Sequence, residues 1–252
     1  MPDKAMLSLV GAGPGDPDLI TVKGLRTIAD ADLILYDALV NKQLLDLNPI
    51  AEKHYVGKRK GQHAYSQSEI NKLIVSNVQK GKHVVRLKGG DVSVFARVAE
   101  EIEYASFFGI QSQVIPGISS YSGIAAQHQI PLTRRCEYES IWVTTGHTCK
   151  GEISEDIKHA AQSSATIVIL MGMTKIKDIQ TELLKHKPED YPVAIVQNGT
   201  LPNEKHHVTN LGNLVQDVVK HDLQSPALII VGHAVVDNVC KLVSTTSIPQ
   251  LV

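Results

Sequence analysis

Short stretches typical of β-strands alternate with longer stretches of helical periodicity along the first half of the chain. The strand-like stretches lie at residues 6–10, 31–36, 53–57, 83–87 and 113–115, the third being a short strand or a loop. Apolar positions at helical spacing predict helices at residues 22–31, 67–79 and 99–107. Because strands that alternate with helices usually pair in parallel, we expect a mainly parallel sheet with helices on its faces.

The predicted helices carry start and stop signals. Thr21 is placed to cap the first helix, and Ser66 or Ser68 is placed to cap the second. Gly81 follows the second helix and can adopt the left-handed conformation that ends many helices. These signals support helices at residues 22–31 and 67–79.

The alternation pauses at Pro116-Gly117 and then begins again. A helix of small residues is expected at 119–127, followed by an extended linker at 130–135. Further strands are expected at residues 140–145, 166–171, 193–197 and 228–231, and further helices at 175–184 and 211–219. The sequence therefore predicts two α/β domains, at residues 1–116 and 117–252.

Composition narrows the class of protein. The chain has 252 residues, of which 43% are hydrophobic and 20% charged, with a formal net charge of −1, as is ordinary for a soluble globular protein. No basic run, and no interleaving of aromatic and basic residues, suggests a nucleic-acid partner. The sequence shows no secretory signal and no membrane-spanning stretch, and its three scattered cysteines fit a reducing cytoplasm.

Four glycine-containing turns follow strand-like runs, at residues 11–16, 89–91, 116–120 and 198–200. Ligands of open parallel sheets bind beyond the carboxyl ends of the strands, so these turns are expected to share one edge. A single turn of this kind usually only reverses the chain, but the four together indicate a ligand site. Asp91, beside two glycines, could bind a ribose or an ammonium group.

The first of these turns departs from the dinucleotide-binding fingerprint. G-x-G-x-x-G from Gly11 would need glycine at position 16, where the chain has Asp16. Pro14 removes a backbone N–H that a phosphate would use, and no G-K-[ST] ending follows. The turn therefore favours close approach of the backbone to a cofactor without a pyrophosphate.

Charged residues near the turns are candidates for chemistry. Asp37 ends a strand, where it either serves a site or caps the next segment. The basic loop at residues 57–61 and the Arg134-Arg135 pair are either solvated charge clusters or binding groups for a polycarboxylate ligand. A lysine crowded by other cations has a lowered pKa, which suits proton transfer.

Other chemistries find less support. The eleven histidines include no H-x-x-x-H or H-E-x-x-H spacing, and His206-His207 lie in a polar stretch interpreted as a loop, so no metal site is expected. Ser119-Ser120 has no base nearby in sequence that would make a nucleophile. Met171, at the end of a strand, is expected to pack in the core.

Short motifs spread along the chain resemble those of the tetrapyrrole methylases. They are Val10-Gly-Ala-Gly-Pro-Gly-Asp-Pro17 with Leu19-Ile-Thr21, Tyr36-Asp37 with Leu39-Val40, Val56-Gly-Lys-Arg59 with Gly61, Val84-Val-Arg-Leu-Lys-Gly-Gly-Asp91, Ile115-Pro-Gly117, Ile130-Pro-Leu-Thr133, Thr145-Gly-His147, Met171-Gly172, Asn198-Gly-Thr200 and Ser225-Pro-Ala-Leu-Ile-Ile-Val-Gly232. Over residues 6–240 the chain is similar to the uroporphyrinogen-III C-methyltransferases of this family. The Gly-Lys-Arg loop and the run at 86–91 are specific to that subfamily, whereas methylases of other corrin intermediates and of diphthine precursors share the first turn.

The resemblance implies the tetrapyrrole methylase fold, with two α/β domains, the active site in the cleft between them, and a homodimer. It implies S-adenosyl-L-methionine as methyl donor and S-adenosyl-L-homocysteine as product. The implied reaction methylates C2 and C7 of uroporphyrinogen III and gives precorrin-2, on the route to sirohaem or cobalamin. Asp37 matches the family's proposed proton acceptor and Lys58 its proposed proton donor. Donor contacts would be Pro14, Gly89, Gly90, Asp91, Val94, Ser119, Ser120, Met171, Gly199 and Ala227, and substrate carboxylates would meet Arg59, Lys60 and Arg134.

One segment departs from the family pattern. After Gly-Gly-Asp the family usually reads Pro-Phe-[Ile/Val]-Phe-Gly-Arg-Gly-Gly-Glu-Glu, whereas this chain has Val92-Ser-Val-Phe-Ala-Arg-Val-Ala-Glu-Glu101. Loss of three glycines and a proline is expected to change the path of the loop. Two alternatives stay open: a methylase of another corrin intermediate such as precorrin-4, and a member that binds cofactor or tetrapyrrole without methylating it. The dehydrogenase and ferrochelatase steps of fused sirohaem synthases are expected to lie elsewhere.

Overall fold

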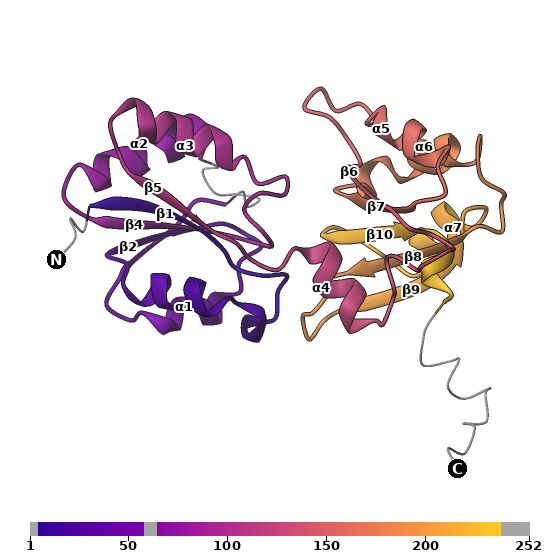
Figure 1. The fold of residues 1–252 in the computed structure, drawn as a ribbon, viewed down its shortest axis with the longest axis horizontal. Coiled ribbons are helices and arrows are strands. Elements are labelled where there is room, and N and C mark those ends of the chain that lie inside the picture. The colour runs from indigo at the N-terminus through magenta and orange to yellow at the C-terminus, as the bar shows by residue number, and fades with distance from the viewer. Residues whose placement is uncertain (1–4, 58–64, 238–252) are drawn as a thin grey trace, which may run out of the picture. The chain divides into compact units, whose positions relative to one another are not determined.

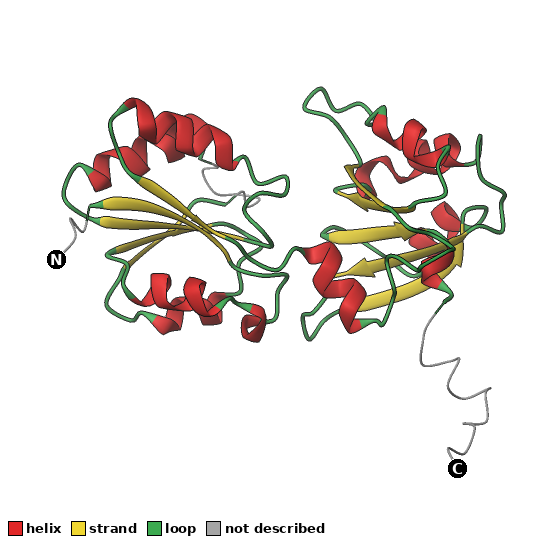
Figure 2. Cartoon of the chain, in the orientation of Figure 1, coloured by secondary structure: helices red, strands yellow, loops and turns green. Residues whose placement is uncertain are grey.

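The computed structural model describes residues 5–57 and 65–237. Lys58, Arg59 and Lys60 of the basic loop lie outside the described residues, as does Cys240. The chain divides into two compact units between Ser120 and Tyr121. Each unit is built around one five-stranded sheet (Figures 1 and 2).

The first unit contains a parallel sheet. Its strands are β1 (Met6–Gly11), β2 (Leu33–Tyr36), β3 (Glu52–Tyr55), β4 (His83–Lys88) and β5 (Ser112–Ile115). Their order is β3-β2-β4-β1-β5, and every neighbouring pair is parallel. The expected parallel sheet is therefore confirmed, and the carboxyl ends of its strands share one edge.

Helices cover both faces of this sheet. Its helices are α1 (Val22–Ala29), α2 (Gln67–Val78) and α3 (Val98–Phe107), with α1 on one face and the other two on the opposite face (Figure 1). Thr21 Oγ1 accepts a hydrogen bond from the Gly24 N–H at 3.1 Å. Ser66 forms a capping box with Glu69, so Ser66 and not Ser68 is the cap. Both predicted helix starts are confirmed.

Alternating side chains of the strands pack against the two helical layers. Leu7 and Leu9 of β1 belong to the buried cluster that contains Ile74 of α2, whereas Val10 belongs to the cluster that contains Ile28 of α1. These side chains are at most 1% exposed. Because the sheet is buried on both faces, most of its strands read as continuous apolar runs.

The second unit contains a mixed sheet. Its strands are β6 (Ile141–Thr145), β7 (Thr166–Leu170), β8 (Pro192–Gln197), β9 (Lys205–Asn210) and β10 (Ala227–Val231), in the order β6-β7-β10-β8-β9. β6 and β7 are parallel, and the other neighbours are antiparallel. The interpretation of His206-His207 as a loop is wrong, because β9 is a polar edge strand. Its sequence, Lys-His-His-Val-Thr-Asn, carries no apolar run that would indicate a strand.

Helices again cover both faces of the second sheet. They are α4 (Ser120–Gln127) on one face, and α5 (Asp156–Ala161), α6 (Ile176–Leu183) and α7 (Leu214–Lys220) on the other (Figure 1). The six-residue α5 is too short to show helical periodicity and was not predicted from the sequence. Short 3₁₀ turns complete the described elements, namely η1 (Pro17–Leu19), η2 (Lys42–Leu47), η3 (Met173–Lys175) and η4 (His233–Val235).

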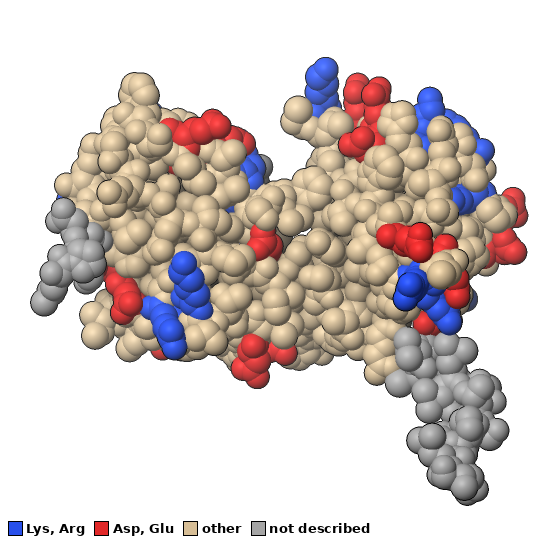
Figure 3. All heavy atoms as spheres, viewed as in Figure 1, with Lys and Arg blue, Asp and Glu red and all other residues tan. Residues whose placement is uncertain are grey.

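Charges of both signs are interspersed on the face of the molecule drawn in Figure 3. On this face, neither the Lys and Arg side chains nor the Asp and Glu side chains form a continuous patch. Within residues 5–57 and 65–237, no helix has the length and apolar character needed to cross a membrane.

Candidate active site

Three glycine-containing turns meet at the carboxyl edge of the first sheet. They follow β1, β4 and β5, which are neighbours in the sheet. Gly13 and Gly90 exchange backbone hydrogen bonds, with the Gly13 N–H donating to Gly90 O at 3.2 Å and the Gly90 N–H donating to Gly13 O at 2.7 Å. Both glycines have positive φ, of 80° and 70°, so two turns are locked together through conformations that favour glycine.

The third turn packs backbone to backbone against the other two. A Cβ on Gly117 would lie 2.4 Å from Gly90 O, and a Cβ on Gly11 would lie 2.6 Å from Gly117 N. Either side chain would force the turns apart. The glycines of the sequence motifs therefore have a structural role of their own, because they let the three turns pack closely at the carboxyl edge of the sheet.

Asp91 anchors the third turn to the second. Its Oδ2 accepts a hydrogen bond from the Gly117 N–H at 2.9 Å, and its Oδ1 accepts from the Ser93 N–H at 2.8 Å and from Ser93 Oγ. Burial acts to raise the pKa of Asp91, but the bonds from Ser93 and Gly117 outweigh burial and hold that pKa below its usual value. The site therefore carries a fixed carboxylate, and its remaining lone pairs can accept bonds from a ligand.

The fourth turn lies in the second unit, after β8. The expectation that four turns share one edge is therefore wrong, because the turn at 198–200 belongs to another sheet. There it lies at the edge that also holds Met171 and Ala227, since Ala227 pairs with Gln197 and Leu228 pairs with Leu170. No pattern in the sequence indicates where the second sheet becomes antiparallel.

Strained residues mark this edge of the second sheet. Met171 has a φ of 55° and is 47% exposed, so the expectation that it packs in the core is wrong. Asn198 and Thr200 have φ values of 53° and 67° on either side of Gly199. A Cβ on Gly199 would lie 2.3 Å from Ile124 Cδ1 of α4. Non-glycine residues held at positive φ are common where a ligand is bound, and the exposed Met171 offers it an apolar contact.

Asp37 follows β2 and is held by Arg86 of the neighbouring strand β4. Arg86 Nη2 donates to Asp37 Oδ2 at 3.2 Å, while the Asp37 Oδ1 atom is buried and has no hydrogen-bond partner among the described residues. The alternative role as a cap is not seen, because Asn41 caps the next segment, η2. Asp37 therefore presents one oriented oxygen and one oxygen that is available as a proton acceptor.

A buried charge network supports this arrangement. Glu101 of α3 has a side chain that is 0% exposed, and its Oε1 accepts from Lys88 Nζ at 2.8 Å and from Arg86 Nε at 3.3 Å. Gln67 Nε2 of α2 donates to the same oxygen at 3.0 Å. Burial, and then the charge of Arg86, lower the pKa of Lys88. Two cations thus share two carboxylates, those of Asp37 and Glu101.

Arg86, Lys88 and Glu101 occur in the sequence motifs but were not predicted as site residues. A signal was present, because β4 carries two cations two residues apart within an otherwise apolar run. Residues at that spacing share one face of a strand, and buried cations need partners. The pattern could therefore have predicted an internal ion-pair network.

The segment that departs from the family pattern forms a turn and the start of α3. Positive φ occurs at Phe95 and Arg97, at 51° and 56°, and these residues agree with the family pattern. Val98 and Ala99, which replace two of the family's glycines, lie in α3, and Val92 is 0% exposed. The substitutions therefore fall at positions where this backbone does not require glycine.

The remaining predicted residues lie in different surroundings. Arg134 forms ion pairs with Asp237 and with Glu137, the latter at 3.2 Å, and its side chain is 42% exposed. Ser119 is buried and Ser120 begins α4, while Pro14 and Val94 are half-buried within their turns. The structure thus brings the described first-unit residues together at one sheet edge and the second-unit residues, except Arg134, at another, while Lys58, Arg59 and Lys60 lie outside the described residues.

Comparison with known proteins identifies the family of the chain. Residues 6–215 match the family described as Tetrapyrrole (Corrin/Porphyrin) Methylases. The chain is 43% identical over 230 residues to a uroporphyrinogen-III C-methyltransferase of Methanocaldococcus jannaschii, covering 90% of this chain and 95% of that protein. It is also 43% identical to a siroheme synthase of Pseudomonas fluorescens, covering 90% of this chain but 50% of that protein. The chain therefore spans about half the length of such synthases.

Solved structures show the same fold. A cobalt precorrin-4 methyltransferase superposes with a TM-score of 0.83 at 29% identity, covering 92% of this chain and 96% of that one. A uroporphyrin-III C-methyltransferase from Thermus thermophilus, complexed with S-adenosyl homocysteine, superposes with a TM-score of 0.80 at 34% identity, covering 92% and 99%. The chain therefore belongs to the tetrapyrrole methylase family.

Proposed function

We propose that the protein transfers methyl groups from S-adenosyl-L-methionine to carbons C2 and C7 of uroporphyrinogen III, giving precorrin-2. The observation that carries the proposal is the Asp37 carboxylate at the carboxyl edge of a parallel sheet, with one oxygen oriented by Arg86 and the other buried without a partner among the described residues. The 43% identity over nearly the full length of the Methanocaldococcus jannaschii enzyme supports the same reaction.

The residues at the two sheet edges fit the methyl donor. Asp91 is a fixed carboxylate that suits the ribose hydroxyls or the ammonium group, and Met171 exposes an apolar side chain in a strained backbone. A Cβ on Gly90 would meet only Ser120 N, at 3.8 Å, so the backbone there is open to close approach. Proposed donor contacts are Pro14, Gly89, Gly90, Asp91, Val94, Ser119 and Ser120 of the first unit, and Met171, Gly199 and Ala227 of the second.

The donor's sulfonium, when bound, supplies an activated methyl group with its own leaving group. The protein's work is then to align the methyl with an electron-rich ring carbon and to move protons after the bond forms. Asp37 Oδ1 takes the proton that leaves the tetrapyrrole, while Arg86 keeps the carboxylate oriented. Lys58 is proposed as the proton donor.

The substrate's carboxylates call for cations. Lys58 and its neighbours Arg59 and Lys60 form a basic loop in the sequence, and Arg guanidinium groups bind carboxylates through paired hydrogen bonds. Arg134 adds a cation whose present partners, Glu137 and Asp237, a substrate carboxylate would have to displace or share. We propose Arg59, Lys60 and Arg134 as substrate-binding residues.

A second candidate function is methylation of another corrin intermediate. The TM-score of 0.83 with the cobalt precorrin-4 methyltransferase favours it. A donor carrying a labelled methyl group, offered with uroporphyrinogen III or with a precorrin-4 analogue, separates the two. Label in the uroporphyrinogen III product supports the first proposal, and label only in the precorrin-4 product supports the second. Donor binding by calorimetry without label in either product identifies a binding protein.

We also propose that the protein is a cytoplasmic homodimer. This proposal rests on the family resemblance and, for the compartment, on the three scattered cysteines, which fit a reducing cytoplasm. Light scattering after size-exclusion chromatography gives the mass in solution. A mass of one chain at micromolar concentration would contradict the dimer.

A further inference from the structure

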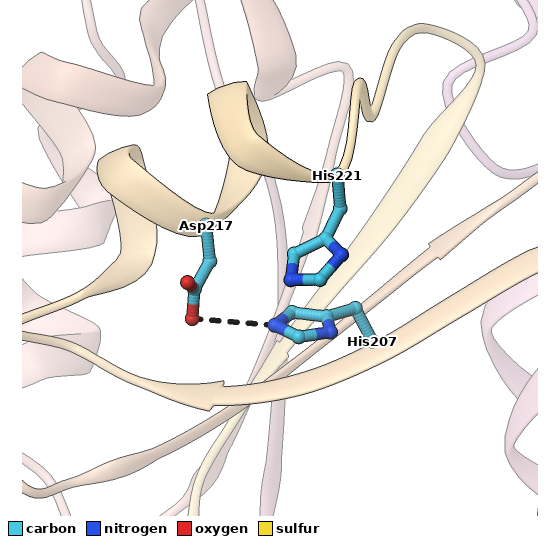
Figure 4. A group of neighbouring side chains, drawn as sticks. All are labelled: His207, Asp217 and His221. Atoms are coloured by element: carbon cyan, nitrogen blue, oxygen red, sulfur yellow. Dashed lines mark hydrogen bonds and ion pairs between the residues drawn. The ribbon is translucent and has the colours of Figure 1, made fainter.

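The edge strand β9 carries two adjacent histidines on opposite faces of the second sheet. His207 pairs with Ile195, which belongs to the core cluster beneath α7, and His206 pairs with Val196, which belongs to the cluster beneath α4. His207 therefore points toward α7. Figure 4 shows its ring beside Asp217, which projects from α7, and His221, which follows the end of that helix.

Asp217 and His221 are four residues apart, so the helix presents both on one side. This Asp-x-x-x-His pair lies outside the H-x-x-x-H and H-E-x-x-H spacings. His207 could not be predicted as its partner, because β9 has no apolar run that marks a strand. The group is assembled from two elements that only the fold brings together.

The three side chains converge at distances that suit one ion. His207 Nε2 lies 3.2 Å from Asp217 Oδ2. One potential ligand atom from each residue lies within 4.8 Å of those of the other two. Two ligands of a tetrahedral Zn²⁺, at bond lengths of about 2.0–2.2 Å, lie about 3.3–3.5 Å apart. Small rotations, chiefly of the exposed His221, would complete the approach.

We propose that His207, Asp217 and His221 form a binding site for a divalent transition-metal ion of the Zn²⁺ type. Two imidazole nitrogens and one carboxylate oxygen are a donor set that favours such ions over Mg²⁺ or Ca²⁺, which prefer oxygen ligands alone. Three protein ligands leave a fourth position to water. The site lies on the second unit and shares no residue with the proposed donor or substrate contacts.

An outer hydrogen bond orients the carboxylate. Thr209, two residues beyond His207 on the same face of β9, donates its hydroxyl to Asp217 Oδ2. This bond, and then the one from His207, hold the pKa of Asp217 below its usual value. Partners of this kind fix ligating groups at known metal sites. Lys220 is a nearby cation, and its repulsion of a bound metal ion would be screened by solvent.

The rings of His207 and His221 lie against each other. Their ring centroids are 4.0 Å apart with an interplanar angle of 32°. Together with Asp217, both rings therefore lie close enough to serve one ion. An ion held by this group would tie the edge strand β9 to α7 and so stabilise the second unit.

Zinc titration of the full-length, untagged and chelator-stripped protein tests the proposal. Calorimetry with ZnCl₂ is expected to show one saturable site. Co²⁺ bound in place of Zn²⁺ is expected to give visible d–d absorption bands typical of nitrogen and oxygen ligands. The titration is run without methyl donor or tetrapyrrole, so its outcome is independent of the proposed methyl transfer.

Variants distinguish this site from chance binding to other histidines. His221→Ala and Asp217→Asn are expected to weaken Zn²⁺ binding by at least about 100-fold, and Thr209→Val by about 10-fold. His159→Ala removes an exposed histidine of α5 and is the matched control, expected to bind as the wild type does. Because His221 is exposed, its variant should fold even where His207→Ala does not. Absence of saturable Zn²⁺ binding in the wild type, or unchanged binding in both His221→Ala and Asp217→Asn, would overturn the proposal.

Discussion

Arg86 Nη2 of β4 lies 3.2 Å from Asp37 Oδ2 at the end of β2, and the two side chains are 5% and 26% exposed. The same guanidinium donates through Nε to the fully buried Glu101. Arg86 therefore links a carboxylate at the edge of the sheet to one in the interior. This link holds Asp37 in a single orientation, which is what a proton acceptor requires.

Replacing Asp37 is expected to impair turnover and spare donor binding. In Asp37→Asn the carboxylate that takes the ring proton becomes an amide, which does not act as a base, so kcat should fall by about 100-fold or more. The dissociation constant of S-adenosyl-L-homocysteine, measured by calorimetry, should stay within about twofold of the wild type, because Asp37 is not among the proposed donor contacts. Asp46→Asn, an exposed carboxylate of η2, is the control. Wild-type turnover in Asp37→Asn would remove Asp37 from the mechanism.

Glu101→Gln is expected to cost far more stability than Glu100→Gln on the same helix. Loss of the Glu101 charge leaves Arg86 and Lys88 undercompensated in the interior, at a cost of about 3–5 kcal/mol. Glu100 pairs with Arg97 at the surface, where its side chain is 49% exposed, so its loss should cost less than about 1 kcal/mol. Urea unfolding of both variants measures the difference. Equal stabilities would show that the buried network is not a stabilising unit.

A methyl group at position 117 is expected to disturb the three turns. In Gly117→Ala the new Cβ would lie 2.4 Å from Gly90 O, and such overpacking costs about 1–3 kcal/mol. The forced shift should also weaken donor binding by at least about tenfold, since Gly90 and Asp91 lie in the displaced turn. Gly81→Ala is the control, because it has positive φ but no heavy atom within 4 Å of the new Cβ. Donor affinity that falls equally in both variants would exclude a local effect at the turns.

The Asp91 carboxylate should stabilise the fold in a pH-dependent way. Its folded pKa is depressed, so its contribution is fully present above the unfolded value of about 3.9 and is lost as pH falls through the folded pKa. The stability difference between the wild type and Asp91→Asn, measured by urea unfolding, should therefore shrink on acidification below about pH 4. Ser93→Ala removes one of the bonds that lower the folded pKa of Asp91, so the loss should be smaller and should be complete at a higher pH. A difference that does not change with pH would contradict the assignment.

The first unit could be predicted from the sequence because both faces of its sheet are buried. Apolar runs such as that of β1 mark the strands, and caps such as Thr21 and Ser66 mark the helices by local chemistry. β9 could not be predicted in this way, because this edge strand has no fully buried position and so no apolar pattern. For the same reason the sequence did not reveal His207 beside Asp217.

The site was predictable as a set of motifs but not as a set of contacts. Asp37 and the run at 86–91 were predicted separately. The contact between Asp37 and Arg86 depends on β2 and β4 being neighbours, and no local sequence pattern predicts that pairing. Met171 was misjudged because a methionine at a strand end is usually buried, whereas here its positive φ turns it outward. In both cases the environment of the residue depends on tertiary structure, which local sequence patterns do not predict.

The most direct test counts the methyl groups added to uroporphyrinogen III. The protein is incubated anaerobically with this substrate and S-adenosyl-L-methionine, and the product mass is determined after limited and after exhaustive turnover. The account predicts one added methyl group early and two at completion, with neither formed by Asp37→Asn. An unchanged substrate mass at stoichiometric enzyme, with donor binding intact, would contradict it.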